Sequence, residues 1–102
     1  MAVKVLWTET ALKNLEDIFE YYKYNASVTT AKRIVQKLAK SSLLIQNSPS
    51  LGRKEELLEG RKFEYRFLIV ENYKIIYWSE DGYIKIASVF DSRQNPEKIQ
   101  SI

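Results

Sequence analysis

Basic side chains supply most of the chemistry that this sequence offers. The 102 residues include 16 lysines and arginines against 13 aspartates and glutamates, with no histidine and no cysteine. The sequence therefore lacks the usual zinc ligands, the usual proton carrier near neutral pH and the thiol nucleophile. Arginine, lysine, tyrosine and carboxylate chemistry remains, and the net charge of +3 favours an acidic partner.

One of the cations lies in the heptapeptide FDSRQNP, residues 90–96, which ends the last apolar run of the chain. Pro96 has no backbone N–H and so prevents further strand pairing. Arg93 is then held beside the end of a strand, where it could contact a binding partner or could simply form an ion pair with Asp91. The residues alone leave both interpretations open.

Two amphipathic helices are expected in the first half of the chain, after a short strand at residues 3–7. Thr8 offers a hydroxyl cap, and apolar residues then recur at helical spacing as far as Tyr22. A second run with the same spacing covers residues 31–45 and ends before a loop that contains proline and glycine. Helices joined by so short a connection pack as an antiparallel hairpin.

The periodicity changes to two in the second half of the chain, which predicts strands. The turn signals Glu71-Asn72 and Asp81-Gly82 separate the alternating segments. Such closely spaced strands form an antiparallel meander. We expect an α+β fold of the order β-α-α-β-β-β, with the helical hairpin on one face of a small twisted antiparallel sheet and the other face partly open. The three predicted strands of the second half are residues 62–70, 73–78 and 83–90.

The length of the chain allows one domain, residues 1–102, with a single modest core. No apolar run is long enough to span a bilayer. No signal peptide is recognisable, and no cysteine is available to staple a small secreted fold. We therefore expect a cytoplasmic protein without a membrane partner.

The predicted strands bring cations together on the open face of the sheet. Because side chains alternate, we expect Arg66 and Lys74 to project from the same side of neighbouring strands, with Arg93 just past the end of the next strand. This arrangement predicts a basic concavity. Arg53 follows a loop glycine, and it either anchors the loop against the sheet or joins the same surface.

Side chains on the predicted helices are candidate partner contacts. Tyr21 and Tyr24 lie off the apolar stripe of the first helix and suit a protein interface, because tyrosine combines an apolar ring with a polar end. Lys37 belongs to a basic stripe on the second helix. Such stripes are usually solvated, and the alternative is a docking surface for an acidic partner.

Four short motifs follow one another along the chain. They are Leu6-Trp7-Thr8 followed by Ala11 and Leu15, Pro49-x-x-Gly52-Arg53, Tyr73-Lys74-Ile75-Ile76-Tyr77, and the closing FDSRQNP stretch. With the order of elements, these motifs resemble the RelE/ParE superfamily of bacterial toxins over nearly the whole chain. The resemblance implies the toxin component of a type II toxin–antitoxin system. It also implies a cognate antitoxin that covers the toxin in a hetero-oligomer, and neither cofactor nor metal.

Two mechanisms are implied by this resemblance, and fold alone does not choose between them. RelE-like members enter the ribosome and cut messenger RNA, whereas ParE-like members poison DNA gyrase. Cutting RNA without a metal requires proton carriers and cations around the phosphate. In this chain Arg66, Lys74 and Arg93 would hold the phosphate, and Tyr65 would carry a proton if its pKa were lowered greatly.

The resemblance is closer to the ParE-like members. Lys74 stands where the nucleases usually carry an arginine, and the tail after Pro96 has neither tyrosine nor histidine. We therefore expect a toxin that inhibits DNA gyrase by binding, without enzymatic activity. The alternatives are a ribosome-dependent, metal-independent endoribonuclease and an inactivated relative that only binds its partner. The expected target contacts are Arg53, Arg66, Lys74, Phe90 and Arg93, and the expected antitoxin contacts are Tyr21, Tyr24 and Lys37.

Overall fold

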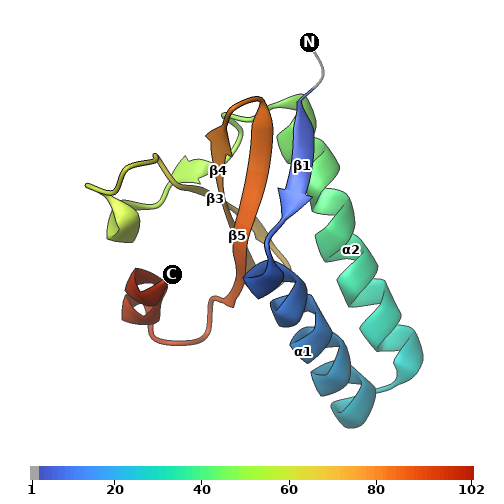
Figure 1. Ribbon diagram of the computed structural model, residues 1–102. Helices are drawn as coiled ribbons and strands as arrows, with labels where there is room; N and C mark the ends of the chain where they lie inside the picture. The colour runs from blue at the N-terminus through green and yellow to red at the C-terminus, as the bar shows by residue number, and fades with distance from the viewer. Residues whose placement is uncertain (1–2) are drawn as a thin grey trace.

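A helical hairpin packs against a five-stranded sheet in the computed structural model, which describes residues 3–102 (Figure 1). The expected order β-α-α-β-β-β is confirmed, with a two-residue strand added before the three long ones. The helices are α1 (Glu9–Asn25) and α2 (Val28–Asn47). The strands are β1 (Lys4–Trp7), β2 (Arg53–Lys54), β3 (Arg66–Val70), β4 (Tyr73–Glu80) and β5 (Tyr83–Asp91). Two short 3₁₀ helices are η1 (Glu56–Leu58) and η2 (Pro96–Ser101).

The sheet has the strand order β1-β5-β4-β3-β2 and is mixed rather than wholly antiparallel. Strands β2 to β5 pair antiparallel, as expected, whereas β1 pairs parallel with β5. The first strand is followed by the helical hairpin, a connection long enough to cross one face of the sheet. β1 can therefore lie beside the last strand in the same direction.

The main core lies between the helical hairpin and one face of the sheet. Thr8 begins α1 by accepting a hydrogen bond from the Ala11 N–H, and its hydroxyl donates to the Ile86 carbonyl at 2.7 Å, which ties the helix to β5. Both helices are amphipathic, and no helix within residues 3–102 is long and apolar enough to cross a membrane. The buried residues of this core are Ala11, Ile18, Ile34, Leu38, Ile45, Tyr73, Ile75, Tyr77, Ile84, Ile86 and Val89.

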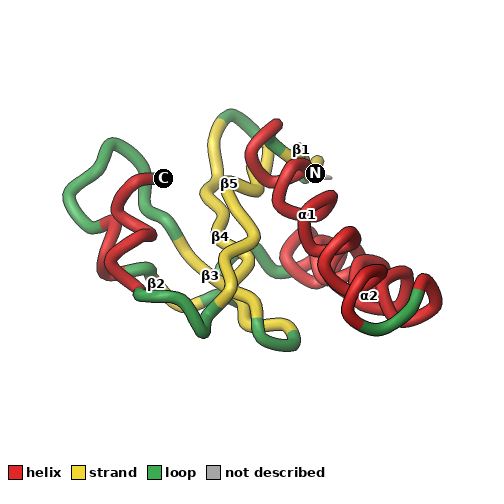
Figure 2. The backbone as a smooth tube through the Cα atoms, turned by 90° about the horizontal axis from the view of Figure 1, so that it is seen from below, coloured by secondary structure: helices red, strands yellow, loops and turns green. Residues whose placement is uncertain are grey.

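The second face of the sheet is half covered by segments that the sequence analysis treated as loop and tail. Figure 2 shows the two short helices on the side of the sheet opposite α1 and α2. Leu58 of η1 and Ile99 of η2 are buried against Ile76 and Ala87 in a second, smaller core. Arg61 donates to backbone carbonyls of the tail and helps to hold η2 there. Only part of this face is left open.

The strand predicted for residues 62–70 begins four residues later, at Arg66. The rings of Phe63 and Tyr65 pack on Trp78, with centroid distances of 6.0 and 5.4 Å. The Tyr65 carbonyl accepts a hydrogen bond from the Glu55 N–H at 2.8 Å, so it serves the loop before η1. The alternating pattern of residues 62–65 therefore reflects aromatic packing over the second face, not pairing with β4.

Candidate functional site

The two cations of the middle strands project from opposite faces of the sheet, which corrects our expectation of a shared side. The two-residue turn pairs Val70 with Tyr73, and in this register Lys74 lies opposite Ile69 and Arg66 lies opposite Tyr77. Residues 66 and 69 differ by an odd number of positions, so their side chains point to opposite faces. The basic concavity expected from Arg66, Lys74 and Arg93 is not formed.

Arg66 holds the loop that precedes β2. Its Nη1 donates to the Gly52 carbonyl at 2.7 Å, and its Nη2 lies 3.0 Å from Glu64 Oε2. The buried hydroxyl of Tyr77 accepts from the Gly52 N–H at 2.9 Å and donates to the Pro49 carbonyl at 2.8 Å. The Pro-x-x-Gly-Arg motif is thus a loop fixed by two side chains of the sheet.

Lys74 lies on the second face and is held by a buried carboxylate. Its Nζ is 3.1 Å from Glu55 Oε2 and 4.2 Å from the centroid of the Phe67 ring. The Glu55 side chain is only 4% exposed and also accepts from the Leu57 N–H at the start of η1. Sequence reasoning missed Glu55, because no local pattern marks a carboxylate whose partner is on a distant strand.

Three of the expected target contacts, Arg53, Lys74 and Phe90, lie on the second face of the sheet. Arg53 lies opposite Phe67 in the pairing of β2 with β3, and Phe90 lies opposite Lys74 in the pairing of β4 with β5. Arg53 and Lys74 both line a surface hollow of about 440 Å³ over the Phe67 ring. We call Arg53, Phe67, Lys74 and Phe90 the second-face patch. Arg53 is exposed and forms no ion pair with any residue in the 3–102 range.

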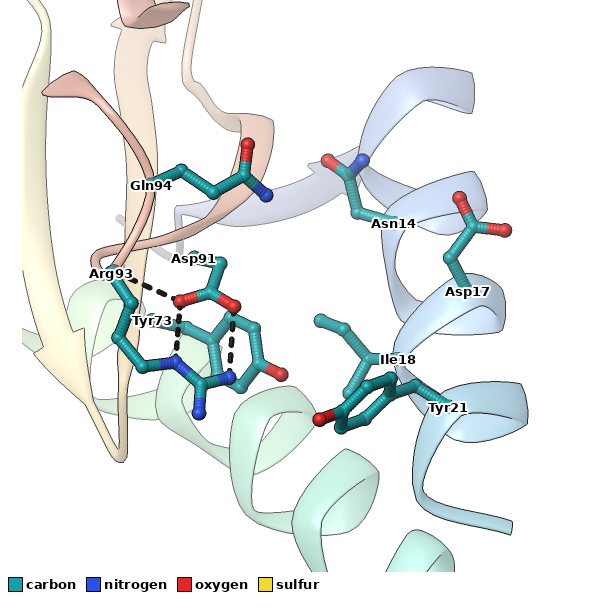
Figure 3. A pocket seen from close by; sticks show the side chains of 8 residues that line it. All are labelled: Asn14, Asp17, Ile18, Tyr21, Tyr73, Asp91, Arg93 and Gln94. Atoms are coloured by element: carbon teal, nitrogen blue, oxygen red, sulfur yellow. Dashed lines mark hydrogen bonds and ion pairs between the residues drawn. The ribbon is translucent and has the colours of Figure 1, made fainter. Parts of the chain in front are cut away.

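Arg93 lies elsewhere, at the junction of α1 with the end of β5 (Figure 3). Its Nε and Nη2 donate to the two carboxylate oxygens of Asp91 at 3.0 and 2.9 Å, so the ion pair that the sequence left open is formed. The Arg93 side chain is still 53% exposed. It borders a hollow of about 290 Å³, which we call the Arg93 hollow; Tyr21 and Tyr73 also line it.

The residues expected to contact the antitoxin differ in whether they already have a partner within the chain. Tyr24 is 91% exposed and Tyr21 is 52% exposed, so both tyrosines are accessible. Lys37 lies 3.2 Å from Glu71 in the turn between β3 and β4, and Arg33 approaches the same carboxylate at 3.4 Å. The hydrogen bond from Lys37 contributes most to lowering the pKa of Glu71. Part of the basic stripe of α2 is thus neutralised within the chain.

Tyr65 lies on the second face with Lys74 but is separated from Arg66 and Arg93, the other two cations that a nuclease would place around it. Its ring packs on Trp78 near η1, whereas Arg66 holds the Gly52 carbonyl and Arg93 lies beside α1. The residues of the nuclease interpretation are therefore distributed over both faces of the sheet. Within residues 3–102 no cluster of three metal-binding side chains is found.

The fold is shared with solved structures of other proteins. The chain is similar to "Chromosomal ParDE TA system from P. aeruginosa", with a TM-score of 0.74 and 17% identity over 88% of this chain and 96% of that one. It is also similar to "The structure of YoeB dimer from Staphylococcus aureus", with a TM-score of 0.54 and 23% identity over 88% of this chain and 97% of that one. At these identities the likeness defines the fold class alone. A sequence search of curated proteins found no match.

A match between the sequence and a family model identifies the protein family. The model of the family described as "ParE toxin of type II toxin-antitoxin system, parDE" matches residues 5–96, which is most of the chain. This protein belongs to the ParE toxin family. The predicted resemblance, closer to the ParE-like members, is confirmed.

Replacing Arg93 with glutamine is expected to raise the pKa of Asp91 toward the ordinary aspartate value of about 3.9. In the folded protein, hydrogen bonds from the Arg93 side chain hold that pKa below its usual range. The pair therefore stabilises the native state above the unfolded pKa, and this contribution is lost as the pH falls through the folded pKa. Because Arg93 is half exposed, the contribution to stability is small. NMR titration of the Asp91 carboxyl carbon measures the shift, and an unchanged pKa in the variant would contradict the assignment.

Proposed function

We propose that this chain is the toxin of a ParE-type toxin–antitoxin pair that acts in the cytoplasm by binding DNA gyrase, until a cognate antitoxin blocks it. The family match over residues 5–96 is the observation that carries the proposal. The likeness to a solved ParDE system supports an antitoxin as the partner. The toxin itself performs no chemistry in this proposal.

The distribution of the cations supports binding over catalysis. A metal-free nuclease needs its cations and proton carriers to converge on one phosphate. Here Arg66 and Lys74 point to opposite faces, and each is engaged by a carboxylate of the chain. Arg93 lies beside α1 with its own carboxylate. A second candidate function, the ribosome-dependent endoribonuclease, has the support of fold likeness alone.

Induction of the chain in bacteria that lack its antitoxin tests the proposal. We expect growth arrest, a DNA-damage response and intact messenger RNA, and we expect the purified chain to inhibit supercoiling by purified gyrase. Primer extension during active translation detects the alternative, because codon-phased cuts in messenger RNA would replace gyrase with the ribosome as the target. Normal growth with abundant folded protein would instead identify an inactivated relative.

The second-face patch is the surface that we propose for gyrase. Replacing Arg53 with alanine is expected to weaken inhibition about 10-fold or more, since an exposed arginine beside an aromatic ring is a frequent centre of binding energy. Lys40→Ala is the matched control, because Lys40 is an exposed cation on α2, and α2 covers the opposite face of the sheet. Inhibition constants from supercoiling assays measure both variants. Equal inhibition by Arg53→Ala and wild type would remove Arg53 from the target surface.

A further inference from the structure

We propose that the Arg93 hollow is a docking site for an acidic side chain of the antitoxin, which lies along α1 across Tyr21 and Tyr24. The proposal rests on the proposed function, since it concerns the partner of the toxin. It joins one residue expected to contact the target with two expected to contact the antitoxin. The structure brings Arg93 and Tyr21 to the same hollow, although they lie far apart in the sequence (Figure 3).

Most acceptors around the hollow are already engaged by donors of the chain. Both carboxylate oxygens of Asp91 accept from Arg93, and Asp17 accepts from Lys13 through Oδ1 at 2.9 Å. The side-chain oxygen of Asn14 accepts from the Val89 N–H at 3.0 Å and from the Ser88 hydroxyl at 3.1 Å. Because a backbone N–H can only donate, the Asn14 oxygen must face β5, and its Nδ2 is the unused group.

The groups left for a ligand are mainly donors. Asp91 engages Nε and Nη2 of Arg93, which leaves Nη1 without a hydrogen-bond partner among residues 3–102. The Tyr21 hydroxyl points toward the Arg93 side of the hollow (Figure 3). The side-chain oxygen of Gln94 accepts a hydrogen bond from Lys98 at 3.4 Å. The Gln94 Nε2 has no hydrogen-bond partner among residues 3–102. A site with several spare donors and few spare acceptors suits a carboxylate, for which arginine is the strongest partner.

The surroundings select an acidic segment of a protein as the occupant. Tyr21 lines the hollow, and Tyr24 is exposed three residues further along α1; aromatic rings of this kind are enriched in protein interfaces. The chain carries a net charge of +3, and the two carboxylates that line the hollow, Asp17 and Asp91, are each paired with a cation of the chain. A side-chain carboxylate in the hollow and apolar contacts along α1 would together place the partner over the helical hairpin.

The test measures binding of the purified protein encoded by the neighbouring gene, by calorimetry at fixed salt. We expect Arg93→Gln to weaken binding about 10-fold or more, because it removes a charged hydrogen bond at a binding interface. Lys62→Gln removes the same charge from an exposed loop distant from the hollow, and it should bind as wild type does. Thermal melting of each variant checks that the fold is intact.

Three outcomes separate the proposals. Weakened binding by Arg93→Gln, with recovery when Arg93→Glu meets a partner variant carrying lysine for one acidic residue, supports the site. Equal affinities of Arg93→Gln, Lys62→Gln and wild type would overturn it while leaving the toxin–antitoxin proposal intact. No binding of the neighbouring protein to the wild-type chain would overturn that partner, and the docking site with it.

Discussion

Replacing Gly52 with alanine is expected to destabilise the protein by about 2–4 kcal/mol, a large fraction of the stability of a small domain. A Cβ atom at this position would lie 2.6 Å from the Tyr77 hydroxyl oxygen and 2.7 Å from the Phe67 carbonyl oxygen. Contacts below 3.0 Å are essentially absent between real Cβ atoms and their neighbours. Glycine is therefore required here by space.

Neither neighbour can move away without losing other interactions. Tyr77 is 1% exposed, and its hydroxyl bonds both Gly52 and Pro49. The Phe67 carbonyl belongs to the backbone of β3 beside β2. Displacing the loop would also break the hydrogen bond from Arg66 to the Gly52 carbonyl. The cost thus combines steric strain with buried polar groups that lose their partners.

Urea unfolding of Gly52→Ala measures the loss as a lower midpoint at an unchanged slope. Leu51→Ala is the matched control, because the neighbouring Leu51 side chain is 50% exposed and its removal should cost little. The double variant Gly52→Ala with Tyr77→Phe should recover little stability, since the Phe67 carbonyl still obstructs the new methyl group. A midpoint for Gly52→Ala within error of wild type would show that the loop is not held as described.

Replacing Glu55 with alanine is the second change with a large expected effect, a loss of about 2–4 kcal/mol in the free energy of unfolding. The substitution leaves the ammonium of Lys74 on the second face without its carboxylate. It also removes the side chain that accepts from the Leu57 N–H and begins η1. The Lys74 side chain is 20% exposed and can reach some water, which keeps the loss below that of a fully buried pair.

Two comparisons distinguish the ion pair from a general effect of charge. Glu59→Ala removes an exposed carboxylate just after η1 and should leave the unfolding midpoint nearly unchanged. The double variant Glu55→Leu with Lys74→Met removes both charges and should recover much of the lost stability, since apolar pairs often replace buried ion pairs without cost. A Glu55→Ala variant as stable as Glu59→Ala would show that Lys74 does not depend on this carboxylate.

Loss of Glu55 should also affect the second-face patch, because Glu55 holds Lys74 in place there. Lys74 and Arg53 line the same hollow over Phe67, and η1 forms part of its wall. Loss of Glu55 would free the ammonium and loosen η1 at once. Gyrase inhibition by a folded Glu55→Gln variant would therefore report whether the target needs the hollow in its present shape, with Arg53→Ala as the reference for a lost contact.

The local elements of this protein were determined by the sequence alone. The helical periodicity and the Thr8 cap predict α1, and the structure confirms the cap. The Asp81-Gly82 turn has positive φ at both residues, 51° and 78°, which is the hairpin geometry that this dipeptide favours. Such signals act over a few neighbouring residues, so they need no tertiary context. The family resemblance rests on the same kind of local motif in a fixed order.

The composition of each surface was decided by the tertiary structure. The pairing register of β3 with β4 put Arg66 and Lys74 on opposite faces, because successive side chains along a strand point to opposite faces of the sheet. The ion pair between Lys74 and the buried Glu55 carboxylate joins residues of different elements, and Tyr21 and Arg93 line one hollow although they lie far apart in the chain. Periodicity reports which side of its own element a residue occupies. Only the packing of helices and strands determines which residues of other elements it meets there.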